Sequence, residues 1–226
     1  MTATLSRLMK QIGYCFKDEA LLLNALTHRS VGQHNNERLE FLGDAILGMV
    51  IADELFQRFP ECSEGEMSRL RASLVKGETL SELARYLSLG DYLKLGPGEL
   101  KSGGFRRGSI LADAFEAILA AVYLDSDLET CRNLILRQLA SRLDLASPDS
   151  VTKDPKTQLQ EYMQARHLSL PVYDVVDVTG KAHAQTFTVE CKVEQGDVVT
   201  AMGSSRRKAE QAAASQLLEK MSGSKS

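Results

Sequence analysis

Three carboxylates recur at helical spacing within residues 35–47, NNERLEFLGDAIL: they are Glu37, Glu40 and Asp44. Steps of three and four residues bring side chains onto one face of a helix that turns about 100° per residue. Apolar residues occupy most of the remaining positions from 39 to 51. Because burying a carboxylate is costly unless a positive group lies against it, this pattern indicates a site for a divalent cation.

A second pair of acids, Asp113 and Glu116, stands three residues apart in the apolar stretch ILADAFEAILAAVY, so the two side chains share a helix face. Mg²⁺ prefers hard oxygen ligands and takes few carboxylates together with water and phosphate oxygens. If the two helices face each other, Glu40, Asp113 and Glu116 are the candidate ligands, with Asp44 one turn on from Glu40. Glu64, in CSEGEMS, is a further candidate at the start of another helix.

Other interpretations of these acids are open. Most single acids on helices are solvated surface charges, and nearby arginines could pair with some of them instead of a metal: Arg38, Arg69 and Arg71. Zinc is disfavoured because His28 and His34 lie outside both acidic helices, which leaves magnesium or manganese. A carboxylate-bridged di-iron bundle would need Glu-x-x-His pairs, which the sequence lacks.

The composition is that of an ordinary soluble globular protein: 226 residues, 43% hydrophobic and 25% charged, with a formal net charge of −3. The four cysteines form no CxxC pair, and no secretory signal precedes them, which is typical of a reducing cytosol. The longest apolar stretch, residues 45–52, is far shorter than the roughly 20 residues that span a bilayer. We therefore expect a cytoplasmic protein with no membrane partner.

Periodicity divides the chain into two architectures. Residues 1–145 predict an all-α domain, in which the glycine-rich segment 90–108 is expected to be one long loop. Residues 146–153 have the composition of a linker. Residues 154–223 predict a small α-β-β-β-α domain. The expected helices of the first domain include 36–59, 64–76, 78–88, 108–124 and 127–144.

A basic cluster opens the last predicted helix, in GSSRRKAEQ, where Ser204 or Ser205 could be the N-cap. Its first turn carries three cations: Arg206, Arg207 and Lys208. Positive charge at a helix N-terminus is unfavourable against the helix dipole, so the cluster makes sense if a phosphate backbone docks there. A solvated basic patch is the alternative. With the helix–three-strand–helix pattern, the cluster predicts binding to an A-form duplex. The further candidate contacts are Thr157, Gln158, Lys181 and His183.

These segments resemble a known family. ERLEFLGDAIL and ADAFEAILAAVYLD are similar to the two acidic helices of ribonuclease III, and LGPGELKSGGFRR looks like a loop of its bacterial members. DPKTQLQEYMQ and GSSRRKAEQAAA resemble a double-stranded RNA-binding domain. The motifs occur in the family's order, and the resemblance extends from residue 1 to about residue 222.

The resemblance implies a double-strand-specific endoribonuclease that forms a homodimer through its helical domain. It implies hydrolysis of phosphodiesters with Mg²⁺, or with Mn²⁺ in its place, which leaves 5′-phosphate and 3′-hydroxyl ends. It also implies processing of ribosomal RNA precursors, of some messenger RNAs and of transfer RNA precursors. An apolar helix at 36–59, which one subunit of this size would not cover, gives the dimer a separate rationale.

Carried over by motif, the metal ligands are Glu40, Asp113 and Glu116, and the catalytic residues are Asp44 and Glu116. Glu37 and Glu64 match acids with supporting roles. One departure is Ala114, where the family's pattern has a threonine, so a hydrogen bond there is in doubt. A different class of function, an RNA-binding regulator without essential cleavage, would keep duplex binding without the acids.

Overall fold

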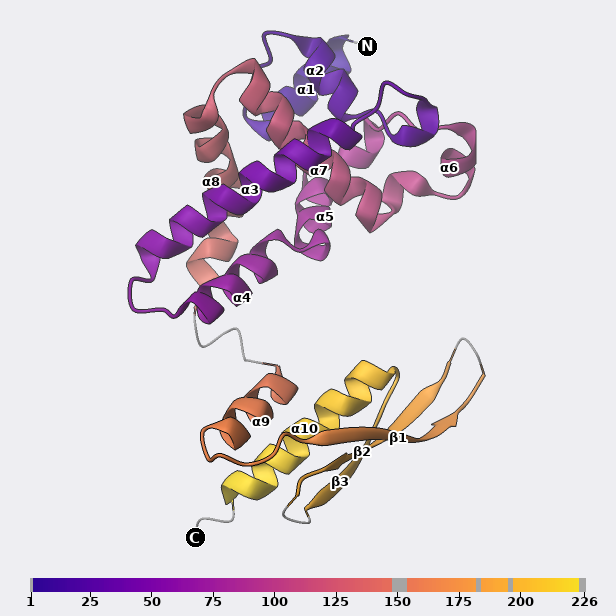
Figure 1. Ribbon diagram of the computed structural model, residues 1–226. Helices are drawn as coiled ribbons and strands as arrows, with labels where there is room; N and C mark the ends of the chain where they lie inside the picture. Colours follow the sequence, from indigo (N-terminus) through magenta and orange to yellow (C-terminus); the bar gives the residue numbers. More distant parts are fainter. Residues whose placement is uncertain (1, 148–153, 182–183, 195–196, 224–226) are drawn as a thin grey trace. The chain divides into compact units, whose positions relative to one another are not determined.

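The structure is a computed structural model that describes residues 2–147, 154–181, 184–194 and 197–223 (Figure 1). The chain forms two compact units, Met1–Val151 and Thr152–Ser226, which are described separately. Residues 148–153, most of the predicted linker, lie outside the described residues.

The first unit is all helical in its described residues, as the periodicity predicts. Its long helix α7 is the centre of the core, because α2, α3, α5 and α8 all pack against it. Eleven of its residues are buried, among them Phe115. The helices are α1 (Thr2–Ile12), α2 (Glu19–Ala25), α3 (Glu37–Arg58), α4 (Glu64–Val75), α5 (Gly77–Tyr86), α6 (Pro97–Lys101), α7 (Gly108–Asp125) and α8 (Leu128–Leu145).

Side-chain caps explain where several of these helices begin. The Asp18 carboxylate accepts a hydrogen bond from the Ala20 N–H at 2.9 Å, and Asp127 accepts one from Thr130 at 2.7 Å. At α4, Ser63 and Glu66 form a capping box. These bonds satisfy N–H groups that the first turn of a helix leaves without a partner.

The segment 90–108 is more regular than predicted. Instead of one long loop, it contains α6 and 3₁₀ turns at Leu89–Asp91 and Gly104–Arg106. Pro97 occupies the first turn of α6, where its missing N–H costs nothing. Backbone hydrogen bonds tie Lys94 to Leu26 and His28, at 2.8 and 3.0 Å. The prediction of one long loop was wrong because short-range backbone bonds, such as Leu100 N–H to the Gly96 oxygen at 3.0 Å, form brief helical turns between the glycines.

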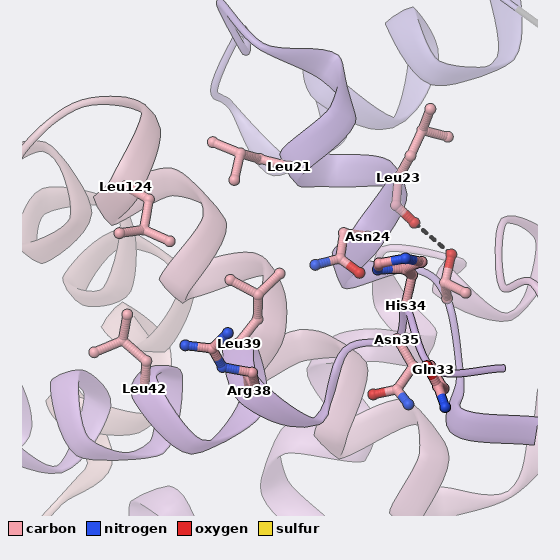
Figure 2. A pocket seen from close by; sticks show the side chains of 11 residues that line it. Leu21, Leu23, Asn24, Gln33, His34, Asn35, Arg38, Leu39, Leu42 and Leu124 are labelled. Atoms are coloured by element: carbon pink, nitrogen blue, oxygen red, sulfur yellow. Dashed lines mark hydrogen bonds between the residues drawn. The ribbon is translucent and has the colours of Figure 1, made fainter.

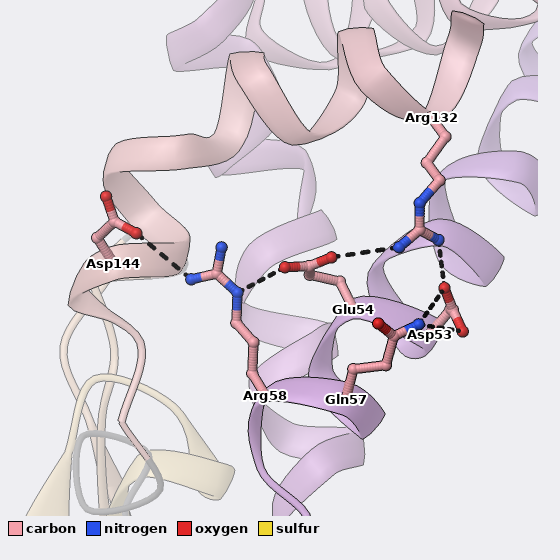
Figure 3. A network of polar contacts seen from close by, with 6 residues as sticks. All are labelled: Asp53, Glu54, Gln57, Arg58, Arg132 and Asp144. Atoms are coloured by element: carbon pink, nitrogen blue, oxygen red, sulfur yellow. Dashed lines mark hydrogen bonds and ion pairs between the residues drawn. The ribbon is translucent and has the colours of Figure 1, made fainter. Parts of the chain in front are cut away.

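A network of charged side chains fixes α3 against α8 (Figure 3). Arg132 of α8 binds both Asp53 and Glu54, the latter at 3.3 Å. Arg58 binds Glu54 at 2.6 Å and Asp144 at 3.3 Å. The Glu54 side chain is only 15% exposed, so its two arginine partners supply the charge that its burial requires.

The second unit has the predicted α-β-β-β-α order. Its elements are α9 (Pro155–Gln164), β1 (Val172–Thr179), β2 (Thr186–Lys192), β3 (Val198–Gly203) and α10 (Arg206–Gly223). The sheet is antiparallel in the order β1-β2-β3. Its core packs Leu159 and Met163 of α9 and Leu217 of α10 against Cys191 and Ala201 of the sheet.

Two local features shape this sheet. The pairing register of β1 with β2 shifts between Val175 and Asp177, so β1 is irregular there. Most residues of β1 are exposed. At the end of β3, an added Cβ on Gly203 would lie 2.4 Å from the backbone nitrogen of Ala209. Glycine therefore allows β3 to approach the first turn of α10, where the basic cluster lies.

Candidate metal centre and basic edge

Gly43 brings the two acidic helices together. An added Cβ there would lie 1.9 Å from the backbone oxygen of Glu116, so α3 and α7 are in direct backbone contact at this point. Gly43 lies between Glu40 and Asp44 in sequence, and the contact therefore places the α3 acids beside those of α7. The sequence shows this glycine, but it gives no sign that the glycine faces α7.

The predicted metal ligands converge at this crossing. Glu40, Asp113 and Glu116 each offer a carboxylate oxygen, and these oxygens all lie within 4.8 Å of one another. All three residues are partly buried. Three hard oxygen donors at this spacing are the kind of set that holds a divalent cation such as Mg²⁺.

The acids of the cluster oppose one another's ionisation. Burial, followed by the negative charges of Asp44, Glu40 and Asp113, raises the pKa of Glu116 to about 8. Burial also raises the pKa of Glu40 and that of Asp113. A divalent cation would relieve both the repulsion and the desolvation cost, so the residues present fit a bound metal ion.

The remaining α3 acids lie around this cluster. Asp44 is exposed and is not one of the three converging residues, but its charge contributes most, after burial, to the raised pKa of Glu116. Glu37 is also exposed and forms an ion pair with Arg29 at 3.5 Å. The Asp44 carboxylate therefore acts on Glu116 from the solvent side of the cluster.

Glu64 does not belong to the cluster of Glu40, Asp113 and Glu116. At the start of α4, it accepts a hydrogen bond from the Ser68 hydroxyl at 2.7 Å. It lines a hollow of about 250 Å³ with Phe56, Met67 and Arg71 among its neighbours. The fold of a single chain thus does not bring Glu64 into the group formed by Glu40, Asp113 and Glu116.

Basic residues that the sequence reasoning missed lie beside the acids. A hollow of about 300 Å³ is lined by Glu40 and Asp113 and also by His28, Arg29 and Arg107. The charge of Arg29 opposes the rise in the pKa of both Glu40 and Asp113, and His28 does so for Asp113. These cations and the acids share no local motif. The fold brings them together, since α2 packs against α7 and backbone hydrogen bonds hold residues 26–28 against Lys94.

The arginines predicted as alternative partners of the acids do not take that role. In the described part of the chain, Arg29 forms an ion pair with Glu37, and none of the predicted acids is paired with Arg38, Arg69 or Arg71. Arg38 lines a separate, largely apolar hollow of about 740 Å³ (Figure 2). Leucines from three helices surround that hollow: Leu21, Leu23, Leu39, Leu42 and Leu124.

The basic cluster opens α10 as predicted, and Arg206, Arg207 and Lys208 are all exposed. The hydroxyl of Ser205 accepts the Lys208 N–H at 3.2 Å, so Ser205 rather than Ser204 caps the helix.

The other candidate RNA contacts lie on α9 and in the turn after β1. Thr157 is exposed and Gln158 is half-buried, both in the first turns of α9. Lys181 is exposed after β1, and His183 lies outside the described residues.

These features define a class: a helical domain with a carboxylate site suited to a metal ion, followed by an α-β-β-β-α module with a basic helix end. Two family models match the chain accordingly. "Ribonuclease-III-like" matches residues 18–143, and "Double-stranded RNA binding motif" matches residues 155–221.

Close relatives span nearly the whole chain. "Ribonuclease 3" of Vibrio vulnificus strain YJ016 is 60% identical over 98% of this chain and 99% of its own length. "Ribonuclease 3" of Shewanella loihica is 59% identical over 96% of each chain. The crystal structure of the nuclease domain of Campylobacter jejuni ribonuclease III covers 61% of this chain and 94% of its own, with 41% identity and a TM-score of 0.59.

The chain belongs to the ribonuclease III family. Its nuclease domain and its double-stranded RNA-binding motif make it an endoribonuclease of double-stranded RNA. Among the described residues, no helix is long and apolar enough to cross a membrane.

Proposed function

We propose that this chain hydrolyses phosphodiester bonds of double-stranded RNA with Mg²⁺, or Mn²⁺ in its place, held by Glu40, Asp113 and Glu116. The observation that carries the proposal is the convergence of their carboxylate oxygens within 4.8 Å. We assign the nuclease to residues 1–145 and RNA binding to residues 154–223, with 146–153 as the linker.

Each acid has a distinct role in this proposal. A bound divalent ion neutralises charge on the phosphoryl oxygens and lowers the pKa of a water molecule. Glu40, Asp113 and Glu116 hold the ion, and Asp44 orients water from the solvent side, next to Glu116. Glu37 and Glu64 support the positioning of the substrate or the metal ion. Hydrolysis breaks the bond from phosphorus to the 3′ oxygen, so the products carry a 5′-phosphate and a 3′-hydroxyl.

The RNA duplex is bound by the basic edge of the second unit. Arg206, Arg207 and Lys208 contact phosphates, and Thr157 and Gln158 contact the duplex from α9. Lys181 adds a contact from the end of β1, and we retain His183, which lies outside the described residues, as a further candidate contact. Recognition of this kind depends on the shape and charge of an A-form helix more than on its sequence.

We further propose a homodimer formed through the nuclease domain. Large apolar side chains on α3 are exposed in the single chain: Phe41 at 80%, Met49 at 49% and Phe56 at 68%. The apolar hollow of Figure 2 adjoins this helix, because Leu39 and Leu42 line it. Exposed apolar surface of this extent favours association with a second copy. A second structure of the nuclease domain of C. jejuni ribonuclease III describes structural flexibility in the region involved in dimer formation of that protein.

Sedimentation equilibrium tests the dimer. We expect the wild-type chain to sediment as a dimer and Phe41→Asp to sediment as a monomer that keeps its helical circular dichroism. A wild-type monomer at micromolar concentration would contradict the dimer.

Cleavage of a defined RNA duplex tests the activity and its site. With Mg²⁺, the wild-type chain should cut the duplex, and Glu116→Gln should bind it without cutting. If Glu116→Gln cleaves as fast as the wild type, the metal-site assignment is wrong. The alternative, an RNA-binding regulator, predicts binding without cleavage in the wild type as well.

If reversing the charges of Arg206, Arg207 and Lys208 leaves duplex affinity unchanged, the proposed binding surface is wrong.

In the cell, we place the protein in the cytoplasm, where it acts on ribosomal RNA precursors, on some messenger RNAs and on transfer RNA precursors. The family resemblance supports this assignment. Sequencing of RNA 5′ ends in cells with and without the protein tests it, because duplex segments of these precursors should remain uncut when the protein is missing.

A further inference from the structure

Glu210 is a buried carboxylate beneath the basic edge. It is 9% exposed, although it lies only one turn from the exposed start of α10. One carboxylate oxygen accepts the Lys156 ammonium at 2.6 Å, and the other accepts the Arg206 Nε–H at 2.8 Å. Burial alone would raise the pKa of Glu210, but the hydrogen bonds from Lys156 and Arg206 outweigh it and lower the pKa. Glu210 is therefore a charged link between α9 and α10.

The two cations bound to Glu210 differ in what they leave accessible. Lys156 is held on two sides, because its ammonium also lies 4.4 Å from the centre of the Tyr173 ring. Its side chain is 34% exposed, whereas that of Arg206 is 65% exposed. The hydrogen bond from Arg206 to Glu210 is donated by Nε. The two Nη groups have no hydrogen-bond partner among the described residues, and together they form the outer edge of a planar guanidinium group.

We propose that Glu210 is a positioning residue for double-stranded RNA binding, which holds Arg206 so that its two Nη groups bind one backbone phosphate. A guanidinium group binds phosphate best through two parallel N–H donors, and fixing it in advance lowers the entropy lost on binding. This inference rests on the proposed RNA-binding surface and divides its basic triplet into two kinds of contact.

Arg207 and Lys208 are the second kind. Both are exposed, and neither forms an ion pair with an acid in the described part of the chain. Their side chains can follow the backbone as mobile charges, whereas Arg206 is fixed by Glu210. The carboxylate that lowers the net charge of this module therefore strengthens its binding to a polyanion, which is opposite to the effect expected from charge alone.

Duplex affinity of the full-length protein, measured without divalent cations over a series of salt concentrations, tests this inference. In Glu210→Gln, the carboxamide oxygen can accept one of the two donors, and its NH₂ group repels the other. We expect affinity to fall roughly three- to tenfold. The negative slope of log K against log salt concentration should also become shallower by about 0.9, because about one phosphate contact is lost.

Glu219→Gln is the matched control, since it removes the same charge from α10 at an exposed position, where the Glu219 carboxylate accepts a hydrogen bond from the Ser215 hydroxyl. It should leave duplex affinity unchanged or raise it slightly. If Glu210→Gln also leaves affinity unchanged or raises it, the positioning role is wrong.

Two further variants separate positioning from folding. Arg206→Lys keeps the charge but loses the two-donor edge, so its affinity should fall as in Glu210→Gln while the salt slope is kept. In an Arg206→Ala background, Glu210→Gln should cause no further loss of affinity. An additional loss there, as large as in the single variant, would show that Glu210 does not act through Arg206 and would overturn the positioning role.

The same measurements separate failure of this inference from failure of the binding surface. If Arg206→Ala and Arg207→Ala both leave duplex affinity and salt slope unchanged, the basic edge does not bind RNA. If both weaken binding but Glu210→Gln does not, only the positioning role of Glu210 is wrong.

Discussion

Replacing Gly43 with alanine tests how the two acidic helices are held in register. The added Cβ would lie 1.9 Å from the Glu116 backbone oxygen and 2.5 Å from its carbonyl carbon, whereas ordinary contact begins at 3.4 Å. The neighbour is backbone, so no side chain can rotate away. To restore ordinary contact, α3 and α7 must separate locally by about 1.5 Å, the difference between 3.4 and 1.9 Å.

The expected cost follows from that displacement. Overpacking a core costs about 1–3 kcal/mol, and contact with backbone at this distance belongs at the upper end. Alanine recovers about 1 kcal/mol through its higher helix propensity. The net loss of unfolding free energy is therefore about 2 kcal/mol. The effect on activity is larger, because displacing catalytic groups by about 1 Å costs on the order of 100-fold in rate.

Single-turnover cleavage of an RNA duplex with saturating Mg²⁺, together with urea unfolding, measures both effects. Gly77→Ala, in α5, is the matched control because no heavy atom lies within 4 Å of its added Cβ. It should cleave like the wild type and be at least as stable, because alanine has the higher helix propensity and its Cβ meets no neighbour. If Gly43→Ala cleaves at the wild-type rate with unchanged stability, the close approach of α3 and α7 does not set the geometry of the site.

Three further predictions address charge and packing. The pKa of Glu116 is raised from about 4.5 to about 8, so folding favours the protonated carboxyl group. Its contribution to the unfolding free energy is therefore fully present below about pH 4.5 and is lost as the pH rises toward 8. Without divalent cations, Glu116→Gln should therefore resist urea better than the wild type at pH 8 and equally at pH 4; equal midpoints at pH 8 would contradict this. Arg132→Ala should lower the unfolding free energy by about 1–3 kcal/mol, because it removes a donor from buried Glu54. Lys76→Ala, which breaks an exposed ion pair, should cost under about 0.5 kcal/mol, and an equal loss in both variants would refute the argument. Gly203→Ala should weaken duplex binding and lower the melting temperature, since its Cβ would lie 2.4 Å from the Ala209 nitrogen; unchanged affinity would count against that packing.

The sequence determines what depends on neighbours along the chain. Helical spacing places Glu40 and Asp44 on one face, and Asp113 and Glu116 on another. The same local rules predict that a serine, Ser204 or Ser205, caps the last helix, and Ser205 does so. These features follow from the period of the backbone and from the hydrogen-bond needs of helix ends, which act over a few residues.

Only the tertiary structure decides which separate segments meet. It brings the acids of α3 and α7 to one site through the backbone contact at Gly43, and it sets Arg29 beside them while leaving Glu64 elsewhere. It also pairs Glu210 with Lys156, more than fifty residues earlier in the chain. In the sequence, Glu210 is one more acid in a helix, and Arg206 is one of three equal cations. Side-chain packing makes them different, because burial fixes one partner of an ion pair and leaves the other facing solvent.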